Sequence, residues 1–223
     1  MDTYKLENID SEDLNDTLRS IEFSFGIQFT DDELTLKLSF GEFCNLIENK
    51  ITGVNIESCT SQQAFYKLRN AIAAQCNIAA TSIFTNTSLL ELFPVKQRRR
   101  NIKAIEKNLG FKLKVLDTYT FVIIFLGVSF LVFFIGLFFN WHLIFGLLIT
   151  CMLIWISNKT ANQFNETTVG NLAAKMARNN YLLSRRNQNS FNRNEIVKTV
   201  QSIFVEHHGI DMSELTPISM FNH

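Results

Sequence analysis

Five basic side chains lie close together in the middle of the chain and are its best candidates for binding a charged ligand. They are Lys96, Arg98, Arg99, Arg100 and Lys103. Each cation near a negatively charged membrane surface adds about 1 kcal/mol of attraction, so the cluster could hold anionic lipid headgroups. An acidic protein partner would offer the same complementarity. The remaining alternative is a solvated face whose charge only orients a neighbouring membrane segment.

Ser11 is a second residue whose type and position point to a definite role. It opens a run with apolar residues at helical spacing, which predicts a helix over residues 11–25. A serine at a helix N-terminus accepts a hydrogen bond from an unpaired backbone N–H group, which contributes about 1 kcal/mol. Glu12 and Asp13 in the first turn favour the positive end of the helix dipole. The residues alone therefore predict a helix cap at Ser11.

No group of residues has the spacing of a catalytic or metal centre. His207 and His208 have only Glu206 beside them as a further metal ligand, and positive charge is favourable at a predicted helix end. No nucleophile with its base, phosphate-binding loop or carboxylate pair stands out. We therefore predict a protein that is not an enzyme and binds no metal. A net charge of zero, from 21 basic and 21 acidic residues, does not favour nucleic acid as a partner.

One apolar segment dominates the elements that must position these side chains. The run from Thr118 to Asn158 contains no Lys, Arg, Asp or Glu. As a single helix it would be roughly 60 Å long, about twice the hydrocarbon thickness of a bilayer, so two spans fit it better than one. A polar cluster at 140–142 lies near its middle. We predict a transmembrane helical hairpin with spans at about 118–139 and 141–157.

Basic residues on both sides of the hairpin predict its orientation. Four lysines from Lys103 to Lys114 precede it and five basic residues from Lys159 to Arg186 follow it, whereas the turn has none. Because positively charged flanks stay in the cytoplasm, we expect an integral protein of the bacterial inner membrane with both termini cytoplasmic. A hairpin buried in a soluble core is the alternative, but such cores rarely contain so long an uncharged run.

The remaining segments have the composition of helices. The chain has only two prolines and nine glycines, and most segments show apolar residues at helical spacing, which predicts an all-α fold. The predicted helices cover residues 11–25, 40–50, 61–76, 101–109, 169–181 and 194–208.

Two parts of the sequence repeat each other. Ile21–Phe29 recurs as Ile105–Leu113, 84 positions later, with the Ile-Glu pair, the glycine and the apolar residues in register. Ser39–Phe43 recurs as Thr168–Leu172 at an offset of 129 positions, and apolar residues of 65–89 recur at an offset of 132. The first two offsets differ by about the length of the uncharged run. The pattern indicates two copies of one small helical domain, one of them interrupted by the hairpin.

The repeated pattern resembles the acyl carrier protein family. That family has a first helix and long loop, an Asp-Ser-Leu motif, a Phe-Gly-Ile stretch and a Thr-Val-Gly-Asp turn. This chain reads Asn-Ile-Asp-Ser at 8–11, Phe-Gly-Ile at 25–27 and Ser-Phe-Gly-Glu at 39–42, while 195–221 resembles the first helix and loop. The similarity covers nearly all of the chain outside the hairpin.

This resemblance implies two acyl-carrier-like small helical bundles in addition to the two-helix transmembrane hairpin. One bundle is permuted, with its break in the long loop, and a helix exchanged with another subunit is the alternative arrangement. The expected domains are 1–52 with 193–223, 61–114 with 160–182, the hairpin at 118–157 and a linker at 183–192.

In the family, the serine at the position of Ser11 carries 4′-phosphopantetheine. This chain has Glu12 where the family has an apolar residue, and its second copy has Phe-Pro-Val-Lys at 93–96 in place of the serine motif. We therefore expect no cofactor, with 4′-phosphopantetheine on Ser11 as the alternative.

The expected function is that of a membrane-anchored, non-catalytic interaction or scaffold module, whose partners are the lipid bilayer and another protein or a second copy. The first alternative is a genuine acyl carrier that serves a membrane acyltransferase. The second is an electrostatic lipid or nucleic-acid binder that uses residues 96–103.

Overall fold

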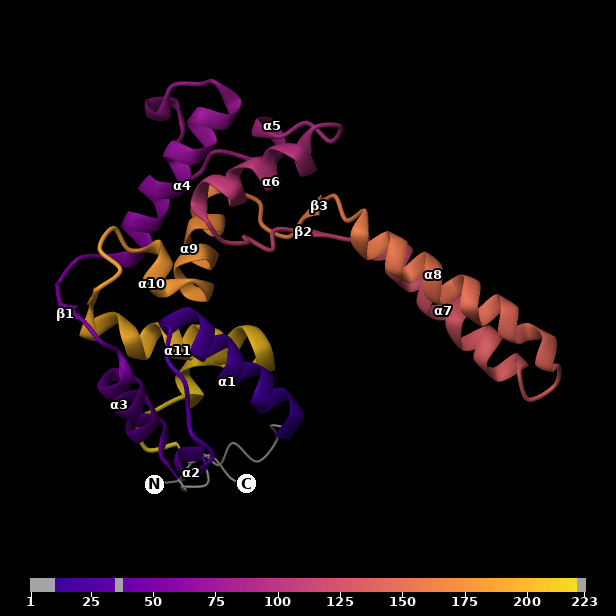
Figure 1. Ribbon diagram of the computed structural model, residues 1–223, viewed down its shortest axis with the longest axis horizontal. Coiled ribbons are helices and arrows are strands. Elements are labelled where there is room, and N and C mark those ends of the chain that lie inside the picture. Colours follow the sequence, from indigo (N-terminus) through magenta and orange to yellow (C-terminus); the bar gives the residue numbers. More distant parts are fainter. Residues whose placement is uncertain (1–10, 35–37, 220–223) are drawn as a thin grey trace. The chain divides into compact units, whose positions relative to one another are not determined.

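The computed structural model describes residues 11–34 and 38–219, and most of them are helical (Figure 1). Helices account for 65% of the chain and strands for 5%, so the prediction of an all-α fold is confirmed. In chain order the elements are α1 Ser11–Phe25, α2 Asp31–Leu34, α3 Phe40–Lys50, β1 Val54–Asn55, α4 Thr60–Cys76, η1 Ala80–Ser82, α5 Leu89–Leu92, α6 Arg98–Leu109, β2 Leu116–Asp117, α7 Thr120–Gly136, η2 Trp141–Leu143, α8 Ile144–Lys159, β3 Gln163–Phe164, α9 Val169–Asn179, α10 Tyr181–Ser184, β4 Ser190–Phe191, α11 Arg193–His208 and η3 Met212–Glu214.

Contacts between residues divide the chain into two compact units. Unit 1 comprises Met1–Asn70 and Ala173–His223, and unit 2 comprises Ala71–Leu172. The divisions fall inside α4 and α9, so each of these helices begins in one unit and ends in the other. The hairpin of α7 and α8 belongs to unit 2.

Unit 1 is a small helical bundle in which α1, α3 and α11 share one core. The rings of Phe40 and Phe43 in α3 each meet Phe204 of α11 edge to face, with 6.1 and 6.3 Å between ring centres. Burying an apolar side chain of this size contributes about 1.5–3 kcal/mol, so these contacts hold the bundle together. The buried residues of this core are Leu18, Ile21, Phe25, Ile27, Phe40, Phe43, Cys44, Ile47, Ile51, Tyr181, Ile196, Val200, Ile203, Phe204 and Leu215.

A buried arginine organises the segment that precedes α11 in unit 1. The guanidinium of Arg185 donates to Thr60 Oγ1 at 2.6 Å and to Ser58 Oγ at 2.9 Å, and it lies 3.7 Å from the Glu195 carboxylate. A buried cation is tolerated only when it is paired and hydrogen-bonded, as it is here. The sequence predicts a plain linker at 183–192, because apolar periodicity does not detect a segment held by polar contacts.

In unit 2, α6 begins at Arg98 rather than at the predicted Asn101. It ends at Leu109 and is followed by the C-cap residue Gly110, whose φ of 84° is a left-handed value that glycine adopts without strain. Apolar side chains from α4, α6, α9 and the loops between them are buried. They include Ala71, Ile72, Ile83, Leu89, Phe93, Ile102, Ile105, Leu109, Phe111, Leu113, Val115, Val169 and Leu172.

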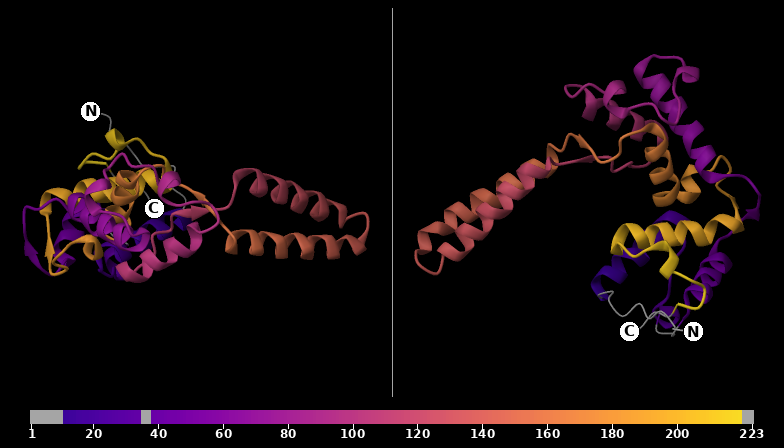
Figure 2. Two further views of the ribbon diagram at one scale, coloured as in Figure 1. Left: turned by 90° about the horizontal axis from the view of Figure 1, so that it is seen from above. Right: turned by 180° about the vertical axis from the view of Figure 1, so that it is seen from behind.

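The two apolar helices α7 and α8 lie side by side in all three views and form a hairpin (Figures 1 and 2). The helical segment Trp141–Lys159 consists of η2 and α8 and is long and apolar enough to cross a membrane. The apolar helix α7, Thr120–Gly136, is shorter. The first helix does not reach Phe139, because the chain turns after Gly136 and the N–H of Asn140 donates to the Gly136 carbonyl at 2.9 Å. Of the two predicted membrane-length spans, the described residues therefore show one, and the companion helix is shorter.

The N-termini of α3 and α9 make equivalent backbone contacts. The N–H of Gly41 donates to the carbonyl of Pro217 at 3.0 Å, and the N–H of Gly170 donates to the carbonyl of Thr85 at 2.8 Å. A Cβ at either glycine would lie 2.9 or 2.7 Å from that same carbonyl oxygen, so both positions require a residue without a side chain. Gly41 and Gly170 are 129 positions apart, and Thr85 and Pro217 are 132 positions apart, which are two of the offsets found in the sequence.

The ends of α1 and α6 are also alike. The Glu22 carboxylate accepts from the N–H of Phe29 at 2.7 Å, and the Glu106 carboxylate accepts from the N–H of Leu113 at 2.8 Å. These bonds are related by the offset of 84 positions. The segments that repeat in sequence therefore also share their local geometry.

Replacing Gly41 or Gly170 with alanine should destabilise the protein. The added Cβ would press on a backbone carbonyl that cannot move independently, and such overpacking costs about 1–3 kcal/mol. The unfolding of the full chain in detergent micelles, followed by circular dichroism in urea, measures this loss. Gly127→Ala is the matched control, since a Cβ there has nothing within 4 Å. Equal stability of G41A, G170A and G127A would contradict the geometry.

Unit 1 should lose stability as the pH falls below about 6.5, the usual pKa of histidine. His208 Nε2 lies 2.8 Å from Thr17 Oγ1, and burial together with the neighbouring His207 lowers the pKa of His208, although Asp13 opposes this. The unfolded chain therefore binds a proton on His208 more readily than the folded chain does. Stability falls as the pH drops through the pKa of His208 in the unfolded chain, and it stops falling below the pKa of His208 in the folded chain. Thermal unfolding between about pH 7.5 and 5.5 measures the effect. His208→Gln should flatten this dependence, and an unchanged slope would refute it.

Candidate membrane-junction site

Arg98 differs from the rest of the predicted basic cluster because it is buried, with only 4% of its surface exposed. Its Nε donates to the carbonyl of Phe93 at 3.2 Å and its Nη1 donates to the carbonyl of Asn162 at 2.6 Å. The guanidinium also lies 4.5 Å from the centre of the Phe164 ring. Arg98 therefore holds α6 to strand β3 and leaves almost no surface for an external lipid. Its binding role stays a prediction that this burial does not favour, and three adjacent arginines give no sequence signal of which one faces inward.

The other basic residues are more accessible. Lys96, Arg100 and Lys103 are exposed, and Arg99 is partly buried. Arg99 Nη2 donates to the carbonyl of Lys159, the last residue of α8. Because the last carbonyls of a helix lack internal donors and carry partial negative charge, a cation there is favourable. Binding of an anionic lipid or partner stays a prediction for these four residues.

Further hydrogen bonds join the two ends of the hairpin. Thr118 Oγ1, just before α7, donates to the carbonyl of Ser157 in α8 at 3.1 Å. Asn162 Nδ2 donates to the carbonyl of Val95 at 3.0 Å. The short strands β2 and β3, which precede α7 and follow α8 in the chain, pair in antiparallel fashion with Leu116 opposite Phe164. Together they fix the point at which the chain enters and leaves the apolar helices.

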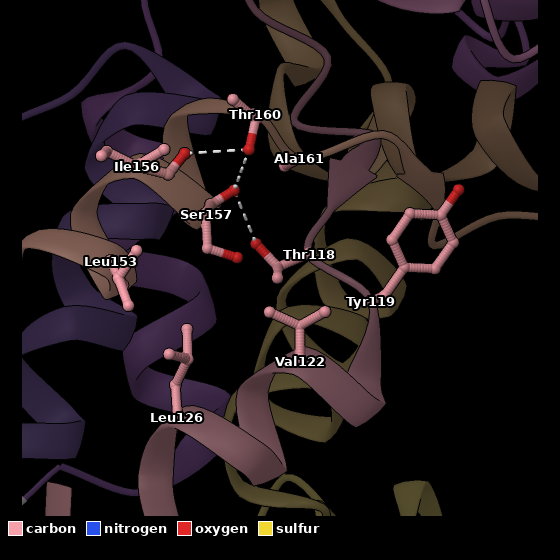
Figure 3. Close-up of a pocket in the computed structure, with 9 residues that line it drawn as sticks. All are labelled: Thr118, Tyr119, Val122, Leu126, Leu153, Ile156, Ser157, Thr160 and Ala161. Atoms are coloured by element: carbon pink, nitrogen blue, oxygen red, sulfur yellow. Dashed lines mark hydrogen bonds between the residues drawn. The ribbon is translucent and has the colours of Figure 1, made fainter. Parts of the chain in front are cut away.

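A groove of about 350 Å³ lies between α7 and α8 at this end of the hairpin (Figure 3). Its apolar walls come from both helices, and the hydroxyl groups of Thr118, Ser157 and Thr160 gather at one end. In Figure 3 the ring of Tyr119 lies apart from these hydroxyls. The groove is lined by Thr118, Tyr119, Val122, Leu126, Leu153, Ile156, Ser157, Thr160 and Ala161. Its size falls at the lower end of the range of about 300–1000 Å³ that small-molecule sites occupy.

Lys159 and Trp155 form a further contact at the end of α8. The Lys159 ammonium lies 4.4 Å from the centre of the Trp155 ring, a cation–π arrangement. Tryptophan and lysine at the end of an apolar helix are typical of the headgroup level of a membrane, where each can keep its polar group in water.

Ser11 is the first residue of α1, at the predicted helix start. Its side chain and that of Glu12 lie outside the described part of the structure. Both the helix cap and the attachment of 4′-phosphopantetheine therefore stay predictions. At the corresponding position of the second copy, Val95 is 54% exposed and offers no hydroxyl group.

Sequence reasoning missed the groove and the role of Asn162. The available signal was the set of small hydroxyl residues at both ends of the uncharged run, Thr118, Ser157 and Thr160. Their proximity depends on how two helices pair across a long loop, which residue spacing along one helix does not report. No protein-family model, curated protein or solved structure matches this chain.

Arg98→Met should destabilise the protein, although the basic cluster keeps its exposed charges. Methionine retains much of the apolar stem but leaves the carbonyls of Phe93 and Asn162 without the guanidinium, and bonds to a charged group are worth about 1.5–3 kcal/mol. Urea unfolding of the full chain in micelles measures this loss. Arg100→Met is the control, since an exposed substitution changes stability by about 0.5 kcal/mol or less. Indistinguishable variants would show that the Arg98 contacts contribute nothing.

Proposed function

We propose that this chain is a membrane-anchored, non-catalytic protein of the bacterial inner membrane. In this proposal α7 and α8 both span the bilayer, and acyl-carrier-like helical modules on the cytoplasmic face recognise a protein partner. The observation that carries the membrane part is the reversed burial of the hairpin. Its large apolar side chains face outward, with exposed fractions of 70% at Phe121, 80% at Phe138 and 61% at Trp155.

Such a surface is unfavourable in water and favourable in lipid. Soluble monomers rarely expose a contiguous apolar patch larger than a few hundred Å². Within α7 and α8 the residues classed as buried are Leu126 and Thr150, and Thr150 Oγ1 donates to the carbonyl of Gly146 at 2.9 Å. Ser129 Oγ likewise donates to its own helix, at the carbonyl of Phe125 and 2.8 Å. These two hydroxyl groups are therefore satisfied without water, as a hydrocarbon environment requires.

Glycines support a close pairing of the two helices. A Cβ on Gly146 would lie 2.4 Å from the Phe133 ring, and a Cβ on Gly136 would lie 2.5 Å from the Leu143 side chain. Membrane helices associate through small residues of this kind, because lipid supplies no hydrophobic force between them. The 17 residues of α7 span about 26 Å, somewhat less than the roughly 30 Å core of a bilayer. Local thinning or the turn residues can accommodate the difference.

The repeated hydrogen bonds support the modular part of the proposal. The Gly41–Pro217 and Gly170–Thr85 contacts, together with the Glu22 and Glu106 bonds, indicate a duplicated unit rather than two unrelated helix clusters. The order of α4, α6 and α9 follows the family pattern that the sequence resembles, with a helix, a long loop, a second helix and a third helix opened by a glycine, whereas α11, α1 and α3 follow it in permuted order. We therefore propose carrier-like modules that act in recognition or as a scaffold.

A genuine acyl carrier is the second candidate. It is favoured by the position of Ser11 as the first residue of α1, a helix whose apolar face belongs to the core of unit 1. Intact-mass measurement on protein purified from its own host separates the candidates. Addition of one phosphopantetheine group that disappears in Ser11→Ala would establish a carrier, and an unmodified mass would favour the non-catalytic module.

The proposed topology predicts that both soluble flanks face the same side of the membrane. A membrane-impermeant maleimide added to sealed inverted vesicles should label Cys59, which is exposed in unit 1, and should not label a cysteine introduced at Asn140 in the turn. Right-side-out vesicles should give the reverse pattern. Cys59→Ser is the control for labelling at other thiols. Labelling of both positions from one side, or release of the chain by alkaline carbonate, would refute the hairpin topology.

A further inference from the structure

We propose that the groove at the base of the hairpin binds one anionic phospholipid. An acyl chain would lie between α7 and α8, and the phosphate group would lie beside Lys159. The inference rests on the proposed membrane hairpin and adds a specific ligand to it. It also assigns the lipid to a defined site rather than to the five basic residues as a group, because one of them, Arg98, is buried.

The interior of the groove matches a hydrocarbon chain. Val122 and Leu126 form one wall and Leu153 and Ile156 form the other. Atoms that line an unfilled space lose the dispersion contacts that a neighbour would provide, so a groove of about 350 Å³ open to lipid is more stable when an acyl chain fills it.

The two threonine hydroxyl groups at the end of the groove do not oppose an apolar occupant. Thr118 Oγ1 donates to the carbonyl of Ser157 at 3.1 Å, and Thr160 Oγ1 donates to the carbonyl of Ile156 at 2.9 Å (Figure 3). Since these two donors are already satisfied, a lipid tail beside them strands neither threonine hydroxyl. The same end of the groove marks the change from apolar to polar surroundings, where a headgroup belongs.

The charges around this end favour an anionic headgroup. Lys159 ends α8, and the Arg99 guanidinium offsets the negative end of the α8 dipole through the Lys159 carbonyl. The positive end of the α7 dipole lies at Tyr119, where no side chain caps the helix. The nearby Asp117 carboxylate accepts from Asn165 Nδ2 at 2.9 Å. Basic pockets between membrane helices on the cytoplasmic side are recognised sites for anionic lipids.

A lipid fits the groove better than a partner helix does. The lining residues span only 118–126 of one helix and 153–161 of the other, about two turns each. A helix–helix interface would continue along the hairpin, whereas a lipid requires an apolar slot next to a polar end.

The test is native mass spectrometry of the full chain after extraction and addition of dioleoyl phosphatidylglycerol or dioleoyl phosphatidylcholine. The wild type should retain one phosphatidylglycerol with at least about tenfold preference over phosphatidylcholine. Val122→Phe fills the groove and should lower phosphatidylglycerol retention by about tenfold. Val128→Phe is the matched control, because Val128 lies on the same helix, is 56% exposed and does not line the groove. Leu153→Phe fills the groove from the facing helix and guards against a local defect in α7.

Lys159→Gln tests the charge separately and should remove the preference while leaving phosphatidylcholine binding unchanged. Equal retention of the two lipids by the wild type, or equal retention by V122F, L153F and V128F, would overturn the proposal. A chain that resists carbonate extraction and has both flanks on one side, yet shows no lipid preference, contradicts this inference alone. A chain that carbonate releases contradicts the membrane anchor as well.

Discussion

The backbone must remain hydrogen-bonded where the chain enters and leaves the apolar hairpin, and this constraint organises unit 2. An unsatisfied backbone group in an apolar environment costs several kcal/mol. Arg99 donates to the carbonyl of Lys159, and Arg98 donates to the carbonyl of Asn162, three residues later in the chain. Two of three adjacent arginines are thus used on carbonyl groups near the end of α8. The basic cluster beside the apolar hairpin thus hydrogen-bonds backbone carbonyls as well as forming a positive surface.

The proposed duplication has room for the hairpin within one of its two copies. In unit 1 the chain runs from Gly26 to Phe40 between the second and third helices of the repeat, and in unit 2 the corresponding connection contains the whole of α7 and α8. The antiparallel pairing of β2 and β3 brings the two ends of the insertion together. The third helix, α9, can therefore begin with the same glycine contact as α3. A long insertion whose ends are adjacent costs little in loop-closure entropy.

The core of unit 1 and the hairpin have opposite patterns of burial. Unit 1 places the rings of Phe25, Phe40 and Phe204 inside, whereas the hairpin turns most of its phenylalanines outward and keeps Thr150 inside. The proposed membrane hairpin accounts for this contrast, because side chains that are buried in water are favourable on a surface that faces lipid. At the boundary, Trp155 and Lys159 carry both apolar and polar parts. The proposed lipid groove lies at this boundary, where an amphiphilic ligand would meet both environments.

The sequence by itself determined the elements that depend on local pattern. Helical spacing predicted α3 at residues 40–50, which the structure reproduces, and it placed α1 and α11 to within a residue at each end, while the uncharged run located both apolar helices. The fixed offsets also relate the residues whose hydrogen bonds recur in the structure. Only the tertiary structure decided that Arg98 faces inward, that Arg185 is buried in an apparent linker and that α7 stops at Gly136. These outcomes depend on which distant carbonyls and side chains come within a few ångströms, and spacing along one segment carries no record of those contacts.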